Sequence, residues 1–266
     1  MKVKVDYVSD VHLGFYIDTK NTKNVKSFVD SKIAIDCKGD ILVVAGDISE
    51  YNDILFEFLN SCSKYYDKVF FVAGNHEYYI TDFKHIHISG DGEKYGYKSM
   101  NKIKEIADNF KDSKDIIFLD RNSSNGGIYD YKGFLIAGDT LWYRPNSLLD
   151  YLYYYPMQND SRFIMSDLSY YKKMIQLHNS SIEWYDKLSS DFDLIVSHVP
   201  PVRSEESKVK NCCYYVDVGI DYKSSLWIYG HDHKENDEVY NNTRFISNPW
   251  GYDSKDFKIK SLVMRK

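Results

Sequence analysis

The sequence is poor in cysteine and contains no long apolar run. Four cysteines occur in 266 residues (Cys37, Cys62, Cys212 and Cys213), and their spacing matches no zinc-binding pattern. We therefore expect free thiols, as in proteins of a reducing cytosol. No stretch is long and apolar enough for a transmembrane helix, and the first residues begin a predicted strand without an apolar signal region. These absences predict a cytoplasmic protein with no membrane partner.

A strong charge of one sign is also missing, as are internal repeats and low-complexity tracts. Lys and Arg total 34 against 39 Asp and Glu, so the net charge is −5. This balance argues against broad nucleic-acid binding, although it permits a nucleotide-sized substrate because bound cations can reverse the charge locally. The composition, 43% hydrophobic and 27% charged, is that of a globular protein. We expect a single domain over residues 1–266 with a sizeable core.

The sequence does contain a recurring pattern, a short apolar strand followed at once by Asp, Asn or His. The clearest case is Val69–Tyr78, in which β-branched and aromatic residues stop at Gly74, before Asn75 and His76. The same pattern occurs at four more strand ends, whose polar residues are Asp10 and His12, Asp47, His198, and His231 and His233. Open α/β sheets bind their ligands at the carboxyl ends of the strands. We therefore expect these side chains to gather at one edge of a sheet.

Helices are expected between most of the strands. Apolar spacing predicts them near residues 23–35, 54–59, 100–110 and 167–188. Hairpin strands are expected over 128–131 and 134–137, and more short strands between residues 226 and 264. An aromatic insertion occupies about residues 142–156. One interpretation of this insertion is a lid that stacks on a nucleobase. The other is a hydrophobic cover of the core or a contact in a dimer.

The polar residues at the strand ends are together a ligand set for metal ions. Imidazoles and carboxylates suit Zn, Mn, Fe or Ni, whereas an all-oxygen set would suit Mg or Ca. Seven ligands exceed the needs of one ion but suffice for two ions that share a carboxylate. Two such ions, about 3.5–4 Å apart, can clamp a phosphoryl group and activate a bridging water. The competing interpretation is that these are ordinary turn residues, and the agreement of five strand-end contexts argues against it.

At these positions the sequence resembles the calcineurin-like metallophosphoesterase family. The family's blocks D-x-H, G-D, G-N-H-[ED], a later H and G-H-x-H stand here, in order, at residues 10–12, 46–47, 74–77, 198 and 230–233. The resemblance implies a four-layered α/β/β/α sandwich with a dinuclear metal site at the strand ends. It also implies two divalent ions, with Mn the expected assay metal. One ion would be held by Asp10, His12, Asp47 and His233, and the other by Asp47, Asn75, His198 and His231.

The resemblance also assigns a catalytic role to His76. This residue matches the family histidine that assists departure of the leaving oxygen, and the alternative is a histidine that only supports a metal ligand. The family's phosphoprotein phosphatases have G-D-x-x-D-R-G, but the corresponding run Gly46–Asn52 lacks the arginine. Arg162 could replace that cation in substrate binding or form a plain surface ion pair. Looser similarity to a bacterial and phage branch of the family occurs at residues 138–142, 159–162, 226–230 and 248–252.

The sequence therefore predicts a metal-dependent phosphoesterase in which hydroxide attacks the phosphorus of a phosphoester substrate. The missing phosphatase arginine slightly favours phosphodiesters, including nucleotide-type substrates. The alternatives are a phosphomonoesterase or protein phosphatase, a nuclease, and a non-catalytic binding scaffold of the same fold. The intact ligand set with His76 argues against the scaffold, and the acidic balance argues against the nuclease.

Overall fold

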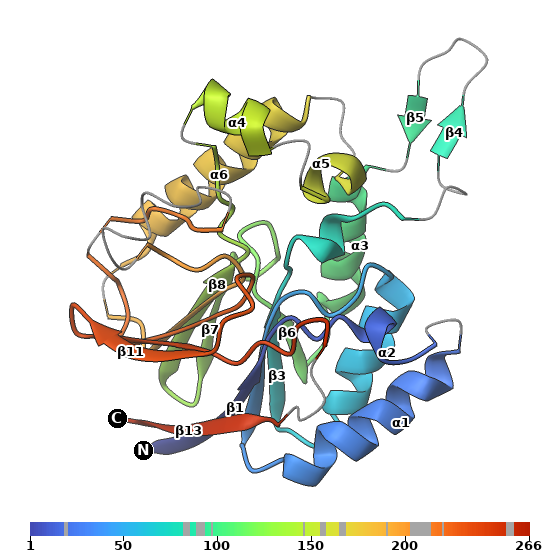
Figure 1. Ribbon diagram of the computed structural model, residues 1–266. Helices are drawn as coiled ribbons and strands as arrows, with labels where there is room; N and C mark the ends of the chain where they lie inside the picture. The colour runs from blue at the N-terminus through green and yellow to red at the C-terminus, as the bar shows by residue number, and fades with distance from the viewer. Residues whose placement is uncertain are drawn as a thin grey trace.

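Two β-sheets lie face to face at the centre of the molecule, and helices cover both outer faces (Figure 1). The computed structural model describes residues 1–18, 21–81, 86–88, 94–96, 98–145, 147–154, 158–164, 169–189, 191–202, 214–219, 221–253 and 258–266. The layers are helix, sheet, sheet and helix, which confirms the predicted α/β/β/α sandwich.

The first sheet has the strand order β13-β1-β2-β3-β6. Four of its strands are parallel, namely β1 (Lys2–Val8), β2 (Ile41–Ala45), β3 (Lys68–Val72) and β6 (Ile116–Phe118). The edge strand β13 (Lys260–Arg265) is antiparallel to β1. The outer face packs against α1 (Thr22–Lys32), α2 (Asn52–Cys62) and α3 (Ser99–Phe110) (Figure 1).

The second sheet has the order β11-β12-β10-β9-β8-β7. Its parallel strands are β8 (Phe134–Asp139), β9 (Leu194–Ser197), β10 (Leu226–Tyr229) and β12 (Thr243–Ser247). The edges β7 (Ile128–Tyr131) and β11 (Asn236–Tyr240) are antiparallel to their neighbours. The long helix α6 (Tyr170–Lys187) packs on the outer face, where Met174 and Leu177 belong to the same apolar cluster as Trp227.

Strand β2 illustrates how the sequence places the two cores. Side chains alternate between the two faces of a strand, so Ile41, Val43 and Ala45 join the core between the sheets, whereas Leu42 and Val44 join the core beneath the helices. All five residues are fully buried. A continuous apolar run is therefore required here, because a parallel strand covered on both faces has no solvent side.

Several short elements lie outside the two sheets and their covering helices. They are η1 (Leu13–Phe15), η2 (Ala34–Asp36), η3 (His76–Tyr78), the paired strands β4 (Ile86–Ile88) and β5 (Lys94–Gly96), α4 (Leu148–Tyr154) and α5 (Asp160–Phe163). The sequence pattern predicted neither α4, within the aromatic insertion, nor α5, just after it. Residues 146, 155 and 156 of the insertion lie outside the described residues.

The cysteine and membrane predictions can be compared with the described part of the chain. Cys37 and Cys62 have free thiols, as expected, while Cys212 and Cys213 lie outside the described residues. Burial raises the pKa of the Cys62 thiol, which is fully enclosed by the core. Among the described helices, none combines the length and the apolar character needed to cross a bilayer.

Candidate metal centre and its pocket

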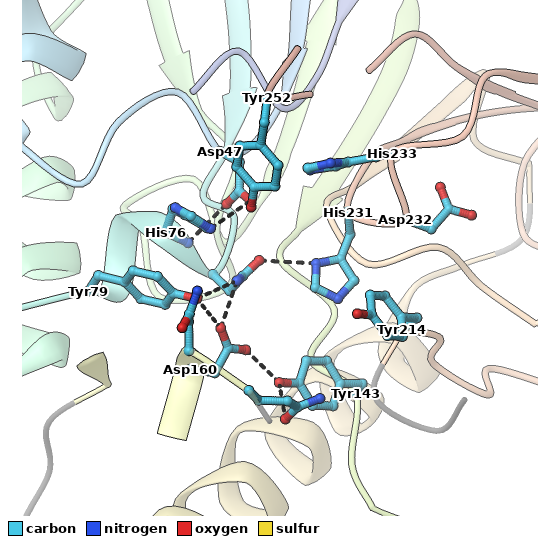
Figure 2. Close-up of a pocket in the computed structure, with 13 residues that line it drawn as sticks. Asp47, His76, Tyr79, Tyr143, Asp160, Tyr214, His231, Asp232, His233 and Tyr252 are labelled. Atoms are coloured by element: carbon cyan, nitrogen blue, oxygen red, sulfur yellow. Dashed lines mark hydrogen bonds and ion pairs between the residues drawn. The ribbon is translucent and has the colours of Figure 1, made fainter. Parts of the chain in front are cut away.

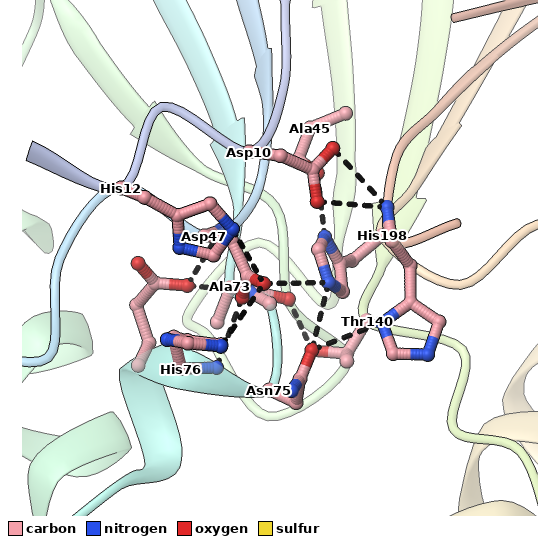
Figure 3. A network of polar contacts seen from close by, with 12 residues as sticks. Asp10, His12, Ala45, Asp47, Ala73, Asn75, His76, Thr140 and His198 are labelled. Carbon is pink, nitrogen blue, oxygen red and sulfur yellow. Dashed lines mark hydrogen bonds and ion pairs between the residues drawn. The ribbon is translucent and has the colours of Figure 1, made fainter. Parts of the chain in front are cut away.

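The structure brings all seven predicted metal ligands to one edge of the sandwich. The parallel strands of both sheets end there, and each predicted ligand follows one of them directly or lies in the loop just beyond. Figure 3 labels five of these ligands, and Figure 2 labels His231 and His233 where they border a pocket. The members of the cluster are Asp10 and His12 after β1, Asp47 after β2, Asn75 after β3, His198 after β9, and His231 and His233 after β10.

One half of the cluster consists of Asp10, His12 and His233, whose ligand atoms all lie within 4.8 Å of one another. Nε2 of His12 and Nε2 of His233 are 3.1 Å apart, and Nε2 of His233 is 3.4 Å from Oδ1 of Asp10. Both Asp10 and His12 are almost completely buried. Three donor atoms thus face a common centre, with the partly exposed His233 on its pocket side.

The other half is arranged around the side-chain oxygen of Asn75. This Oδ1 lies 2.9 Å from Nε2 of His198 and 3.0 Å from Nδ1 of His231. Oδ2 of Asp47 is 3.4 Å from Nε2 of His198 and 3.7 Å from Nε2 of His12 (Figure 3). Asp47 therefore stands between the two halves, where one carboxylate could serve both.

The chemistry of this donor set fits divalent cations. Ring nitrogens and carboxylate oxygens converge at short distances inside the protein, and such lone pairs repel one another unless a proton or a cation lies between them. A mixed set of imidazoles, carboxylates and one amide is typical of Zn, Mn, Fe or Ni sites. The two halves, joined by Asp47, provide enough donors for two cations.

The backbone of the cluster is strained. Five of the ligands have positive φ angles, namely Asp10 (52°), His12 (44°), Asp47 (57°), His231 (73°) and His233 (52°). Each such conformation costs about 1–3 kcal/mol outside glycine, and these outliers concentrate at functional sites. Hydrogen bonds between neighbouring turns oppose this cost, including Asp10 N–H to Gly46 O at 3.0 Å and His12 N–H to Asp47 O at 2.9 Å.

Two glycines of the sequence blocks are explained by close packing at the cluster. A Cβ atom at Gly74 would lie 2.1 Å from Oδ1 of Asp47. A Cβ atom at Gly46, where φ is +83°, would lie 2.5 Å from Nδ1 of His198. Any larger residue at either position would displace a predicted ligand.

Glu77 has a structural role that the sequence pattern did not assign. Its Oε2 accepts backbone N–H groups from Gly74 and Asp47 at 2.6 and 2.9 Å, and its Oε1 accepts those of Ile48 and Ser49 at 2.7 and 3.1 Å. Glu77 is fully buried. One carboxylate therefore ties the turn after β3 to the turn after β2, and fixes the relative positions of Asn75 and Asp47.

His76 lies on η3 at the rim of the cluster, and Glu50 contacts its far side. Nδ1 of His76 is 2.6 Å from Oε1 of Glu50, and its Nε2 is 3.9 Å from Oδ2 of Asp47. Burial lowers the pKa of His76, but the charges of Asp47 and Glu50 outweigh burial and raise it to about 9. These two carboxylates therefore favour the protonated form of the ring. The sequence signal for Glu50 was its place three residues after Asp47, where the phosphatase block G-D-x-x-D also has an acid.

A pocket of about 290 Å³ opens beside the cluster (Figure 2). Its lining is made by Asp47, Asn75, His76, Tyr79, Tyr143, Gln158, Asn159, Asp160, Tyr214, His231, Asp232, His233 and Tyr252. Among these described residues there is no lysine or arginine. Arg162 is exposed on α5 and is not part of this lining. Sequence reasoning assigned no role to Asp160 or Tyr252, although both lie in segments that resemble the bacterial and phage branch.

Comparison with known proteins agrees with this geometry. The family model of the calcineurin-like phosphoesterases matches residues 3–235, so the chain belongs to that family. An uncharacterised protein, L509 of Acanthamoeba polyphaga mimivirus, is 23% identical over 285 residues, which cover 92% of this chain and 90% of that protein. The crystal structure of phosphopantetheinyl hydrolase from Mycobacterium tuberculosis aligns with a TM-score of 0.58 at 18% identity, covering 94% of this chain and 89% of the hydrolase. This likeness shows a shared fold.

Proposed function

We propose that the protein is a dinuclear metal-dependent phosphoesterase that prefers phosphodiesters. The observation that supports this preference is the charge of the pocket. Its described lining contains Asp160 and Asp232 in addition to Asp47, and no lysine or arginine. A phosphomonoester dianion gains from cationic side chains around the phosphoryl group, whereas a diester has one negative charge and a neutral second ester arm.

In this proposal the seven clustered residues hold two divalent cations. Asp10, His12 and His233 hold one, Asn75, His198 and His231 hold the other, and Asp47 contributes to both. The position of Asp47 between the two halves supports the shared role. When bound, the two cations supply charge neutralisation for the phosphoryl group and a water activated for attack near neutral pH.

The chain's own groups then orient the ester and handle its protons. Protonated His76, held by Glu50, donates a proton to the departing oxygen, because its ring faces both the pocket and the metal cluster. Four tyrosine rings line the pocket and can contact the organic arms of the ester, namely Tyr79, Tyr143, Tyr214 and Tyr252. Such rings stack on flat groups, which supports nucleotide-type diesters as substrates.

The test compares two esters with the same leaving group. Metal-stripped protein is refilled with Mn²⁺ and assayed with bis-p-nitrophenyl phosphate and with p-nitrophenyl phosphate, which differ in charge but both release p-nitrophenol. We expect a higher kcat/KM for the diester, and loss of activity together with both ions in the Asp47→Asn variant. Asn tolerates the left-handed backbone of position 47, so this variant removes the charge and leaves the turn intact.

A second variant tests the charge argument by itself. Asp232 lines the pocket but is not among the predicted metal ligands. Asp232→Asn should raise monoester hydrolysis relative to diester hydrolysis, because it removes one repulsive charge. A wild-type preference for the monoester would overturn the proposed substrate class. Absence of turnover with either ester, while two ions are bound, would favour the binding scaffold instead.

A further inference from the structure

Asp160 is the first residue of α5, and it contacts the metal cluster from outside the two sheets. Its Oδ1 accepts a hydrogen bond from Nδ2 of Asn75 at 2.8 Å, although the residues are 85 positions apart in the sequence (Figure 2). The hydroxyl of Tyr79 also donates to Oδ1, and the hydroxyl of Tyr143 donates to Oδ2. Three donors on two oxygens satisfy a buried carboxylate, which only accepts.

This contact favours one orientation of the Asn75 amide, together with a longer hydrogen bond of 3.2 Å from Nδ2 to the Tyr79 hydroxyl. An asparagine amide has an oxygen that can bind a cation and an NH₂ group that cannot. In the observed orientation the oxygen faces His198 and His231, and the NH₂ group faces Asp160. Rotating the amide by half a turn would place its oxygen against the carboxylate and its NH₂ group among the ligands. Asp160 opposes that rotation because two acceptors repel each other.

Backbone hydrogen bonds and ring packing connect α5 to the segment that follows η3. The Ile80 N–H donates to Phe163 O at 2.8 Å, and Tyr79 and Ile164 form an antiparallel bridge. The rings of Tyr79 and Phe163 pack with centroids 5.3 Å apart. These contacts keep α5 against Tyr79 and Ile80, and so place Asp160 beside Asn75. Asp160 is only 5% exposed, so water does not easily replace it as an acceptor.

We propose that Asp160 is a positioning residue for Asn75, and that it sets the affinity of the cation held by Asn75, His198 and His231. The proposal rests on the ligand assignment made under the proposed function. It extends that assignment to a carboxylate that binds no metal itself. Ligand-orienting groups of this kind typically change metal affinity by about 10–100-fold when removed.

The same carboxylate joins the metal centre to the pocket wall. The Tyr143 ring stacks on His231 with centroids 5.8 Å apart and an angle of 23° between the planes. The Tyr143 hydroxyl, in turn, bonds both Asp160 and the Tyr170 hydroxyl. Removing the Tyr143 hydroxyl leaves the Asp160–Asn75 bond in place, so Tyr143→Phe should weaken cation binding less than Asp160→Ala does.

The test measures metal binding without any substrate. Metal-stripped protein is dialysed against a series of Mn²⁺ concentrations, and bound ions are counted by mass spectrometry. We expect two ions in the wild type. In Asp160→Ala one ion should remain tightly bound, while the dissociation constant of the other rises about 10–100-fold. Asp160→Asn keeps the shape and one acceptor oxygen, so its loss should be smaller.

Three comparisons separate a positioning role from a general structural one. Ser161→Ala changes the neighbouring residue of α5 and removes its hydrogen bond to Gln158 O, just before that helix, while leaving the Asp160–Asn75 bond in place. This variant should bind both ions as the wild type does. The melting temperature of metal-stripped Asp160→Asn should stay close to that of the wild type. In an Asn75→Ala background, Asp160→Ala should cause no further loss, because the two residues act as one unit.

The outcomes are distinct from those of the ester assay. Unchanged binding of both ions in Asp160→Ala would overturn the positioning role, as would equal weakening of both ions accompanied by a lower melting temperature without metal. An additional loss of affinity in the Asn75→Ala background would also overturn it. A wild type that binds two ions but hydrolyses neither ester would refute the proposed function and leave the positioning role intact.

Discussion

Nδ1 of His76 lies 2.6 Å from Oε1 of Glu50, while the opposite nitrogen of the same ring faces the metal cluster. The Glu50 carboxylate accepts a hydrogen bond from Nδ1–H. This bond fixes the orientation of the ring and leaves Nε2 facing the cluster. The carboxylate also raises the pKa of His76, together with Asp47 and against the effect of burial. Under the proposed function, this arrangement prepares His76 to donate a proton to the leaving oxygen.

Replacing Glu50 by Gln should reduce turnover without removing metal. The amide keeps the shape of the side chain but lacks the charge that supports protonated His76, so we expect kcat for bis-p-nitrophenyl phosphate to fall about 10-fold or more. Glu105→Gln is the matched control, since Glu105 is an exposed acid that bonds the neighbouring Asn52. Equal rates in the two variants would contradict the role assigned to Glu50.

Replacing His76 by Ala should spare both ions and slow the reaction. General acid catalysis typically contributes about 10²–10⁴-fold, and the contribution grows as the leaving oxygen becomes more basic. We therefore expect a larger loss of kcat for a diester with a phenol leaving group than for one with p-nitrophenol. The measurement is kcat for both diesters alongside the bound metal content. Normal metal content with normal rates would refute the catalytic role of His76.

Replacing Glu77 by Gln should destabilise the protein, because one oxygen of the bidentate acceptor becomes an NH₂ group that faces two backbone donors. Hydrogen bonds to a charged group are worth about 1.5–3 kcal/mol each, so we expect the free energy of unfolding to fall by roughly 3–5 kcal/mol. Urea unfolding of the metal-stripped protein measures this change. Glu183→Gln should alter stability little, since Glu183 is exposed and its ion pair with Lys187 lies on the surface. Comparable stability of both variants would exclude the bridging role of Glu77.

Replacing Asp120 by Asn should stabilise the protein more at pH 8 than at pH 4.5. Burial and the nearby charge of Asp139 raise the pKa of Asp120 to about 6, against the effect of Arg121. Between pH 4 and pH 6 the folded state thus binds more protons at this site than the unfolded state, so the contribution of Asp120 to stability falls as pH rises. This pKa shift of Asp120 corresponds to a change of about 3 kcal/mol in the free energy of unfolding.

The buried surroundings of Asp120 suit this substitution. The Oδ1 atom accepts the Asn122 N–H at 2.7 Å, which an asparagine oxygen can also do, and Oδ2 has no hydrogen-bond partner within the described structure. Urea unfolding of wild type and variant at pH 8 and at pH 4.5 measures the difference in their free energies of unfolding. Asp115→Asn serves as the exposed control. If the difference in free energy of unfolding between wild type and Asp120→Asn is the same at both pH values, the raised pKa of Asp120 is disproved.

The sequence by itself determined the strands of the two large sheets, most helices and the seven clustered side chains, but not the paired strands β4 and β5. These features depend on local patterns: an apolar run forms a strand buried on both faces, and a polar residue just beyond it emerges at the strand's carboxyl end. Because parallel strands end at one edge of a sheet, five separate blocks were enough to predict that Asp10, Asp47, Asn75, His198 and His231 meet. The four-layered sandwich followed from the family resemblance, and the structure confirms it.

Only the tertiary structure decided what supports those side chains. Asp160 contacts Asn75 although 85 positions separate them in the sequence. Glu77 accepts hydrogen bonds from backbone groups up to 30 positions away, and no sequence pattern links it to them. Such partners are chosen by how the turns pack after the sheets have formed, and a sequence period of two or 3.6 residues contains no information on that packing. The charge of the pocket arises in the same way, from loops that converge only when the two sheets are face to face.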